Sequence, residues 1–284
     1  MTELQEKILY IAKYLDKFCK DNSIEYFLMG GSALGAMRHG GFIPWDDDLD
    51  IFMTYDNYHR FIELFEKKGD KDTFFLEKED TKEWPLYISQ LCLKGTTMIN
   101  AEFKNNMDKH HNVFVDIMCL YSAPERKVLR YMQYASAQWL RVNALEKTKF
   151  MPKNKYKKIV LKVSLAVVNP ITKKIFIKHV RHYEKKDAKY AGHYFGRARF
   201  KNCAFPKEYI GKQRFVKFED TEFPVFEKVE EYLRMRYGDK WFEMPDKKTR
   251  DMYPNHGEFV DLNKDYTEYM SPDRKVWILP EKSS

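Results

Sequence analysis

Apolar residues in the N-terminal part of the chain follow helical spacing in some stretches and strand spacing in others. Leu4, Ile8, Ile11 and Leu15 recur at helical intervals, which predicts an amphipathic helix over residues 3–20. A second helix is expected at 55–68, and strands are expected at 26–29, 46–53, 87–93 and 112–118. Helices and strands that alternate in this way are typical of an α/β domain.

A glycine pair follows the first predicted strand. The apolar run 26–29 ends at Gly30 and Gly31, which predicts a buried strand that leads into a tight turn. Ser32 is expected to cap a short helix over 33–39. Backbone N–H groups at the start of a helix favour anions, so this turn is a candidate anion site.

The composition and the predicted secondary structure change after the first predicted domain. Residues 125–200 read as long, lysine-rich helical sequence, whereas 201–284 mix short strands with a helix expected over 227–237. We therefore expect a core formed by 1–124, a basic helical segment, and a C-terminal part that packs back on the core.

Composition and charge narrow the class of protein. With 284 residues, of which 44% are hydrophobic, the chain can bury a substantial core. The net charge of +8 and a pI near 9.0 indicate an anionic partner, which could be a nucleotide, a nucleic acid or a membrane surface. Charge alone does not choose among these partners.

Cysteine spacing and hydropathy indicate a cytoplasmic protein, soluble or peripheral to a membrane. Cys19, Cys92, Cys119 and Cys203 lie far apart without a CxxC pair, so they are expected to be reduced and structural. The N-terminus has early acidic residues and does not resemble a secretory signal. The longest apolar stretch, 159–168, is about half of the ~20 residues that cross a bilayer.

A cluster of aspartates follows the short helix. On a strand, Asp46, Asp48 and Asp50 would share one face, with Asp47 on the other. Two unit charges ~4 Å apart repel by ~4 kcal/mol at an effective dielectric near 20, so protons or a cation must neutralise them. Oxygen ligands beside an anion-binding turn favour Mg²⁺ or Mn²⁺. The alternative is a solvated acidic loop.

Asp116 is a further candidate for the same site. It lies inside the apolar run "NVFVDIM", where a lone acid is costly to bury unless it is paired or metal-bound. It would complete the acidic site if its strand lies beside that of Asp50. The sequence combines, in this order, a strand, a glycine turn, a helix, an acid-apolar-acid strand and a later acid. This combination is a more specific sign of a metal and phosphate site than any one of the features alone.

This order resembles the nucleotidyltransferase superfamily related to DNA polymerase β. More narrowly, "GGSALGAMRHGGFIPWDDDLDIFM" resembles the LicD family, which includes bacterial phosphocholine transferases and, more distantly, the fukutin-related proteins. The similarity extends to "NVFVDIMCLYSAPE", "KFEDTEFPV" and "YLRMRYGDKWFEMP" and so spans most of the chain. It implies an α/β (α+β) fold with a nucleotidyltransferase-like mixed sheet, flanking helices and an added helical segment.

LicD-like enzymes move a phosphoalcohol from a CDP-activated donor to a sugar hydroxyl and release CMP. The resemblance implies transfer from CDP-choline or another CDP-alcohol to a precursor of a cell-surface glycan, capsule, teichoic acid or lipopolysaccharide. Asp48 and Asp50 would then hold Mg²⁺ or Mn²⁺, and Asp46 would bind outer-shell water. Asp116 would join the metal site while orienting or deprotonating the acceptor hydroxyl.

The resemblance also implies substrate contacts. The candidates are Gly30, Gly31, Ser32, Arg38, His39 and Lys94. The glycines and Ser32 would cradle the diphosphate, Arg38 would clamp a phosphate, and Lys94 would contact phosphate or pyrimidine. A structural role competes for His39. Candidates for the acceptor side, with fold support as the alternative, are Tyr237, Asp239, Arg250 and His256.

Other interpretations stay open. The stretch "KKIVLKVSLAVVNPITKKIFIKHV" suits an interfacial helix on an anionic membrane, which fits a lipid-linked acceptor, but a lysine-fringed core helix has the same pattern. A rival enzyme with the same metal site would move a nucleoside monophosphate from an NTP to a small molecule. A non-catalytic nucleic-acid-binding protein is the third interpretation, and the acids oppose it because they repel phosphates.

Overall fold

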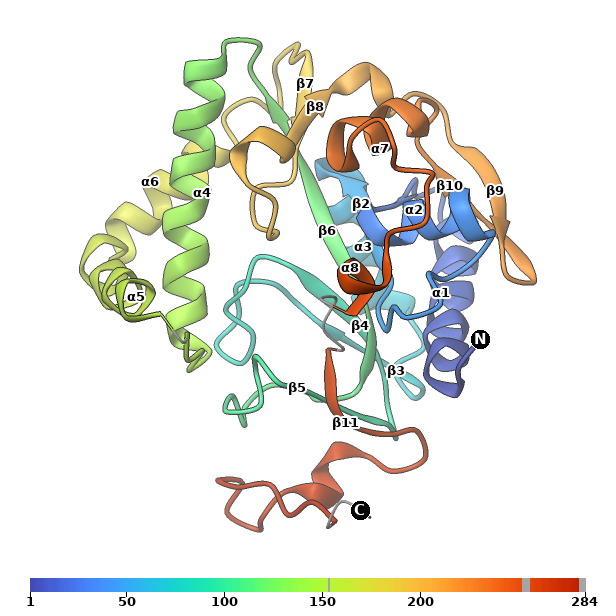
Figure 1. Ribbon diagram of the computed structural model, residues 1–284. Helices are drawn as coiled ribbons and strands as arrows, with labels where there is room; N and C mark the ends of the chain where they lie inside the picture. The colour runs from blue at the N-terminus through green and yellow to red at the C-terminus, as the bar shows by residue number, and fades with distance from the viewer. Residues whose placement is uncertain (153, 252–255, 281–284) are drawn as a thin grey trace.

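A mixed sheet forms the centre of the molecule (Figure 1). The computed structural model describes residues 1–152, 154–251 and 256–280. The strands of this sheet run in the order β1-β2-β6-β4-β3, and β7 and β8 extend it from β6. They are β1 (Phe27–Leu28), β2 (Asp50–Thr54), β3 (Phe74–Glu77), β4 (Ser89–Leu93), β6 (Val113–Ala123), β7 (Tyr190–Gly192) and β8 (Ala204–Pro206).

Two strand pairs and a set of helices surround the sheet. The pairs are β9 (Arg214–Phe218) with β10 (Thr221–Val225), and β5 (Thr97–Asn100) with β11 (Gly257–Asp261). The α-helices are α1 (Glu3–Asp21), α2 (Gly30–His39), α3 (Tyr55–Lys68), α4 (Lys127–Lys147), α5 (Lys155–Val167), α6 (Pro170–Val180), α7 (Val229–Tyr237) and α8 (Lys247–Asp251). Short 3-10 turns are η1 (Phe200–Asn202), η2 (Lys207–Tyr209) and η3 (Tyr266–Tyr269). The predicted mixed α/β class is confirmed.

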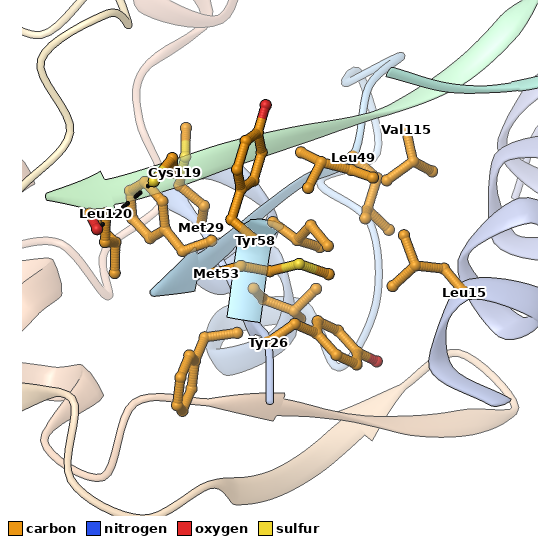
Figure 2. Close-up of a cluster of buried hydrophobic side chains, with 14 of the residues drawn as sticks. Leu15, Tyr26, Met29, Leu49, Met53, Tyr58, Val115, Cys119 and Leu120 are labelled. Atoms are coloured by element: carbon orange, nitrogen blue, oxygen red, sulfur yellow. Dashed lines mark hydrogen bonds between the residues drawn. The ribbon is translucent and has the colours of Figure 1, made fainter. Parts of the chain in front are cut away.

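The first helix forms as its sequence predicts. Thr2 and Gln5 make a capping box, in which each side chain bonds the other's backbone N–H. The apolar stripe of α1 packs on the sheet, and Leu15 lies with Leu49 and Val115 in the core shown in Figure 2. Full burial of one such leucine contributes about 1.5–3 kcal/mol, so this stripe holds α1 in place.

The predicted strand 46–53 begins only at Asp50. The preceding segment is a loop, because Asp46 N–H closes a turn on the Ile43 carbonyl and Asp47 is drawn away toward the C-terminal part of the chain. The prediction that the acids alternate across a strand is therefore wrong.

The prediction that Ser32 caps the following helix is also wrong. Helix α2 already begins at Gly30, whose φ of 49° lets the chain turn directly from β1 into the helix. Ser32 lies within the first turn, and its hydroxyl accepts a hydrogen bond of 2.8 Å from Asp50 N–H. This bond ties the start of α2 to the start of β2.

Strand β6 is longer than the predicted 112–118, and it organises the sheet. It pairs with β2 in parallel and with β4 antiparallel, and past Met118 it pairs with β7, where Tyr121 lies opposite Gly192. The second half of β6 therefore acquires its partner from a segment far along the chain, which the local pattern does not show.

The basic helical segment contains α4, α5 and α6, and the predicted helical character is confirmed. Figure 1 shows α5 and α6 packed against α4. Polar bonds join them: Gln133 donates to the Val180 carbonyl at 2.7 Å, and Asn143 donates to the Ser164 carbonyl at 3.2 Å. Among the described residues, no helix is long and apolar enough to cross a membrane.

Candidate active site

Two aspartates from neighbouring parallel strands stand side by side. Asp50 opens β2 and Asp116 lies in β6, and the register of the two strands pairs these residues directly. The prediction that the strand of Asp116 lies beside that of Asp50 is confirmed. Two acids paired on adjacent strands project from the same face of the sheet, so they can face a common ligand.

Asp116 is held in position by a buried polar chain. Gln90 lies opposite it in β4 and donates an amide hydrogen bond of 2.7 Å to Asp116 Oδ1. Lys109 Nζ donates to Gln90 Oε1 at 3.0 Å and to Glu77 Oε2 at 3.2 Å. Because the lysine occupies the amide oxygen, the amide nitrogen must face Asp116.

Asp46 and Asp48 reach the same place from the loop before β2. Burial, followed by the charge of Asp48, raises the pKa of Asp46 to about 8, and burial raises the pKa of Asp48. Burial likewise raises the pKa of Asp116 to about 6, and it raises that of Asp50 well above the usual range, with further upward contributions from Asp48 and Asp116. Without a cation, these carboxyls release their protons at a higher pH than aspartates in water do.

The sequence assigns no role to Asp47. In the structure, Asp47 anchors the C-terminal part of the chain to the loop before β2. It accepts hydrogen bonds from the His256 backbone at 2.7 Å, from His256 Nδ1 at 2.7 Å and from the Gly257 backbone at 3.1 Å. The bond to Asp47, followed by the charge of Asp48, raises the pKa of His256 to about 9. His256 thus adds a positive charge 3.6 Å from Asp48.

The acids line a cavity of about 330 Å³. Its polar lining includes Asp46, Asp48, Asp50, Gln90, Asn100, Glu102, Lys109, Asp116, Arg141, His193, Arg197, Arg236 and His256. Its aromatic lining includes Trp45, Trp84, Tyr87, Phe103, Phe114, Phe195 and Tyr237. Carboxylates therefore meet cationic side chains and aromatic rings in one chamber.

Arginines form the cationic wall of the chamber. Arg236 lies beside Gly30, where an added Cβ would be 3.5 Å from its guanidinium, and it donates to His193 Nε2 at 3.2 Å. Arg197 pairs with Glu102 at 2.7 Å. The phosphate groups of a nucleotide are natural ligands for such guanidinium groups.

The glycine turn enters the site only in part. Gly31 lines the cavity, and a Cβ there would lie 3.1 Å from Asp46 Oδ2, so the acid approaches the bare backbone. Gly30 donates its N–H to the Tyr232 hydroxyl at 3.2 Å, so this group is not directed at a diphosphate. The Ser32 hydroxyl is engaged by Asp50 N–H. Of the three residues predicted to cradle the diphosphate, Gly31 is the one that lines the cavity.

Arg38, His39 and Lys94 lie apart from the cavity lined by the described residues. Arg38 donates to the Glu243 carbonyl at 3.1 Å and to His39 Nε2 at 3.0 Å, so it fastens a C-terminal loop. Lys94 follows β4 and donates to the Lys71 carbonyl. The structure therefore places these three residues in structural contacts rather than at the acids.

The acceptor-side candidates divide in the same way. Tyr237 and His256 line the cavity. Asp239 is exposed and pairs with Arg234 at 3.5 Å, and Arg250 lies over the Trp45 ring. Sequence reasoning missed Gln90, Lys109, Arg141, Arg197 and Arg236. Arg236 stands inside a quoted motif, but the others carry no local signal.

The carboxylate groups of the cavity have the right chemistry to bind a hard divalent cation, but they are spaced too widely to hold one as they stand. Carboxylate oxygens are the ligands that Mg²⁺ and Mn²⁺ prefer, and burial, together with the neighbouring carboxylates, raises the pKa values of these acids. Across the described ranges, however, no three Asp, Glu, His or Cys side chains converge closely enough to hold one ion. An ion would have to draw the carboxylates together.

Comparison with known proteins identifies the domain that holds the acids. Residues 23–138 match the family model described as LicD/FKTN/FKRP, nucleotidyltransferase domain. This stretch is similar to the LicD-family domain, so the resemblance predicted from the sequence is confirmed. The matched stretch includes the four cavity aspartates, Glu102 and Gln90, whereas Arg197, Arg236 and His256 lie beyond it.

Individual relatives extend the likeness. The chain is 27% identical over 270 residues to the lipopolysaccharide cholinephosphotransferase LicD of Haemophilus influenzae, which covers 90% of this chain and 96% of that protein. It is 48% identical over 40 residues to the ribitol 5-phosphate transferase FKRP of Homo sapiens, which covers 14% of this chain and 8% of that protein. The first likeness reaches well beyond the LicD domain.

Proposed function

We propose that this protein is a phosphoalcohol transferase. It moves phosphocholine or a related phosphoalcohol from a CDP-activated donor to a sugar hydroxyl of a cell-surface glycan, lipopolysaccharide, teichoic acid or capsule precursor, and it releases CMP. The observation that carries the proposal is the pairing of Asp50 with Asp116 inside a cavity that also holds arginines. The likeness to two named phosphoalcohol transferases supports it.

Mg²⁺ or Mn²⁺ is the cofactor in this proposal. Asp48, Asp50 and Asp116 would hold it, with Asp46 beside them. When bound, it would neutralise the carboxylates and the donor diphosphate and stabilise the charge on departing CMP. The raised pKa values of these acids are the property that a cation would reverse.

Asp116 is the group that handles the acceptor proton. In the transfer, the acceptor oxygen forms a bond to phosphorus, the bond from phosphorus to the CMP oxygen breaks, and the hydroxyl proton passes to Asp116. This carboxylate is ionised at neutral pH, with or without a bound cation, so it can accept the proton. Gln90 fixes its orientation through the 2.7 Å bond.

Arg236 and Arg197 position the donor. Their guanidinium groups line the cavity with the acids, where they can bind the diphosphate oxygens, and bidentate guanidinium bonds also fix direction. The aromatic wall suits the apolar face of an alcohol group or base. In this proposal the reaction takes place in the cytoplasm, and no nucleic acid takes part.

Product analysis tests the proposal. The protein is incubated with Mg²⁺, candidate glycans and a panel of CDP-choline, other CDP-alcohols and NTPs, and the released nucleotide is identified. We expect CMP from a CDP-linked donor. Release of pyrophosphate from an NTP would instead establish the nucleotidyltransferase alternative, and release of no nucleotide from any donor would overturn both.

Variants tie the activity to the paired acids. Asp50→Asn and Asp116→Asn should each lower the rate about 100-fold or more, because several kcal/mol of charge stabilisation are lost. Asp72→Asn changes an exposed acid before β3 and serves as the matched control. Full activity in either cavity variant would contradict the proposed site.

A further inference from the structure

Helix α5 exposes an apolar stripe. Tyr156, Ile159, Val160 and Val163 have exposed fractions of 79%, 59%, 46% and 45%. At 100° per residue these four positions fall within one sector of about 100°. The structure describes the whole of α5, and only Leu161 and Ser164 of it are buried.

The buried and apolar sides of this helix are therefore different sides. Leu161 and Ser164 face α4, whose Asn143 bonds the Ser164 carbonyl. The stripe lies on another sector and is not used by the fold. The exposed side of α6 continues the pattern with Ile171 and Ile175, which are 73% and 57% exposed. A lysine-fringed core helix would bury its apolar residues, so this alternative is excluded for α5.

Positive charge borders the stripe. The side chains of Lys155, Lys158 and Lys162 are exposed on the adjacent sector of α5. From Lys147 to Tyr183 the sequence has eleven Lys and Arg residues and neither Asp nor Glu, which exceeds the net charge of +8 for the whole chain. The remainder of the protein is thus slightly acidic, and the positive charge is concentrated at α5 and α6.

We propose that α5 and the exposed side of α6 dock the protein on an anionic lipid bilayer. The apolar stripe enters the boundary between headgroups and acyl chains, and the lysines remain among the anionic headgroups. An apolar sector flanked by a dense, one-sign charge complements a negatively charged membrane, whereas a second copy of this basic surface would be repelled.

This surface is connected to the cavity through α4. One side of α4 carries α5 and α6, and Arg141 and Leu145 of α4 line the cavity. Docking by α5 would thus hold the cavity near the bilayer, where a lipid-linked acceptor is presented. The docking surface goes beyond the proposed transfer reaction and does not depend on which group is transferred.

Vesicle flotation tests the inference without any activity measurement. The full chain is floated with vesicles of phosphatidylcholine alone and with vesicles that also contain phosphatidylglycerol. We expect binding to the anionic vesicles only, weakened by high salt. Ile159→Ser with Val163→Ser should lower the bound fraction about ten-fold or more, because two inserted side chains lose their apolar burial.

Matched variants separate the helix from general effects. Val128→Ser with Met132→Ser removes an exposed apolar pair of the same spacing from α4 and should leave flotation unchanged. Lys155→Gln, Lys158→Gln and Lys162→Gln together should abolish the preference for anionic vesicles, whereas Lys185→Gln, Lys201→Gln and Lys212→Gln should retain it. Circular dichroism and thermal unfolding confirm that each variant is folded.

Three results would overturn the inference. One is the absence of wild-type binding to anionic vesicles. Another is an equal loss of vesicle binding in the α5 variants and in their matched controls, which would assign binding to the overall charge or hydrophobicity of the protein. The last is a wild-type protein that does not float with vesicles but sediments as a dimer. If Ile159→Ser with Val163→Ser dissociates that dimer, α5 is a self-association surface.

Discussion

The buried side chain of Lys109 bonds both to Glu77 and to Gln90, which orients Asp116. The side chains of Lys109 and Glu77 are each 2% exposed, and the Lys109 ammonium fixes the Gln90 amide that orients Asp116. The Trp84 ring lies 4.6 Å from the ammonium and covers it. One side chain therefore serves both stability and the alignment of the acid.

Lys109→Met should destabilise the protein by about 3–5 kcal/mol, because Glu77 keeps a buried charge without its partner. Adding Glu77→Gln should restore most of that stability, since the amide is neutral and keeps an acceptor for His110 N–H. Transfer activity should stay low in the double variant, because Gln90 no longer has its fixed orientation. Urea unfolding and CMP release measure the two effects separately. Equal stability of the single and double variants would contradict this account.

Glu79 is a second buried carboxyl, outside the candidate site. One oxygen lies 3.8 Å from Arg181, and the other has no hydrogen-bond partner among the described residues. Burial raises the pKa of Glu79 to about 7 from an ordinary value of 4.5. The folded protein therefore binds a proton here that the unfolded chain releases.

The stability that this proton gives is full below pH 4.5 and is lost as the pH rises to about 7. Its loss amounts to roughly 3 kcal/mol at most. Glu79→Gln should remove this fall, so the unfolding free energy of the variant should change less between pH 5 and pH 8 than that of wild type. Glu222→Gln, which alters an exposed carboxylate, should keep the wild-type dependence. An unchanged pH dependence in Glu79→Gln would refute the assignment.

Local motifs revealed some residues of the site and could not reveal others. Asp116 was predictable because an acid inside an apolar strand is unusual, and Asp50 because it belongs to a crowd of aspartates that follows a glycine turn. Gln90 and Lys109 were not, since a glutamine in a strand and a lysine in a loop are ordinary in sequence and acquire meaning only when β4 and β6 pair.

At the scale of elements, α2 packs tightly against the loop that carries the acids. An ideal Cβ on Gly35 would lie 2.5 Å from the Gly41 carbonyl oxygen and 3.1 Å from the Ile43 nitrogen. Both atoms belong to backbone, which cannot rotate away. The close approach of helix and loop therefore depends on a residue without a side chain at Gly35.

Gly35→Ala should destabilise the protein by about 1–3 kcal/mol, because the loop must move to admit the methyl group. The change is informative because alanine alone would favour the helix by roughly 1 kcal/mol. Gly31→Ala is the comparison, since its methyl group would meet only the Asp46 carboxyl, which can shift. Thermal unfolding should show a clear loss for Gly35→Ala and a small one for Gly31→Ala. A stabilised Gly35→Ala variant would show that the packing is looser.

Elements were predictable where a local pattern decides them. Helix α1 has its apolar stripe and capping residues within its own span, and it forms as predicted. The segment before Asp50 has strand-like alternation, yet Asp47 bonds to backbone that lies 209 positions away. Strands β5 and β11 also depend on each other across the chain, and neither was predicted.

At the scale of the molecule, the proposed metal site predicts that a divalent cation stabilises the folded protein. A ligand that binds only the folded state stabilises it by about 2.7 kcal/mol at 100 times its Kd. Adding Mg²⁺ or Mn²⁺ should therefore raise the Tm by several degrees in a thermal unfolding assay. The rise should vanish in Asp50→Asn, whereas Na⁺ at equal ionic strength should reproduce little of it. No shift with either metal would contradict the proposed cofactor.

The bond between Asp47 and His256 also sets an order of events during synthesis. The acidic loop is made within the first fifth of the chain, but the backbone that anchors it comes near the end. A ribosome must finish nearly the whole polypeptide before this anchor exists. The growing chain therefore carries all four cavity aspartates long before it can hold the loop of Asp46 and Asp48 in its final place, and the finished site appears only when synthesis is almost complete.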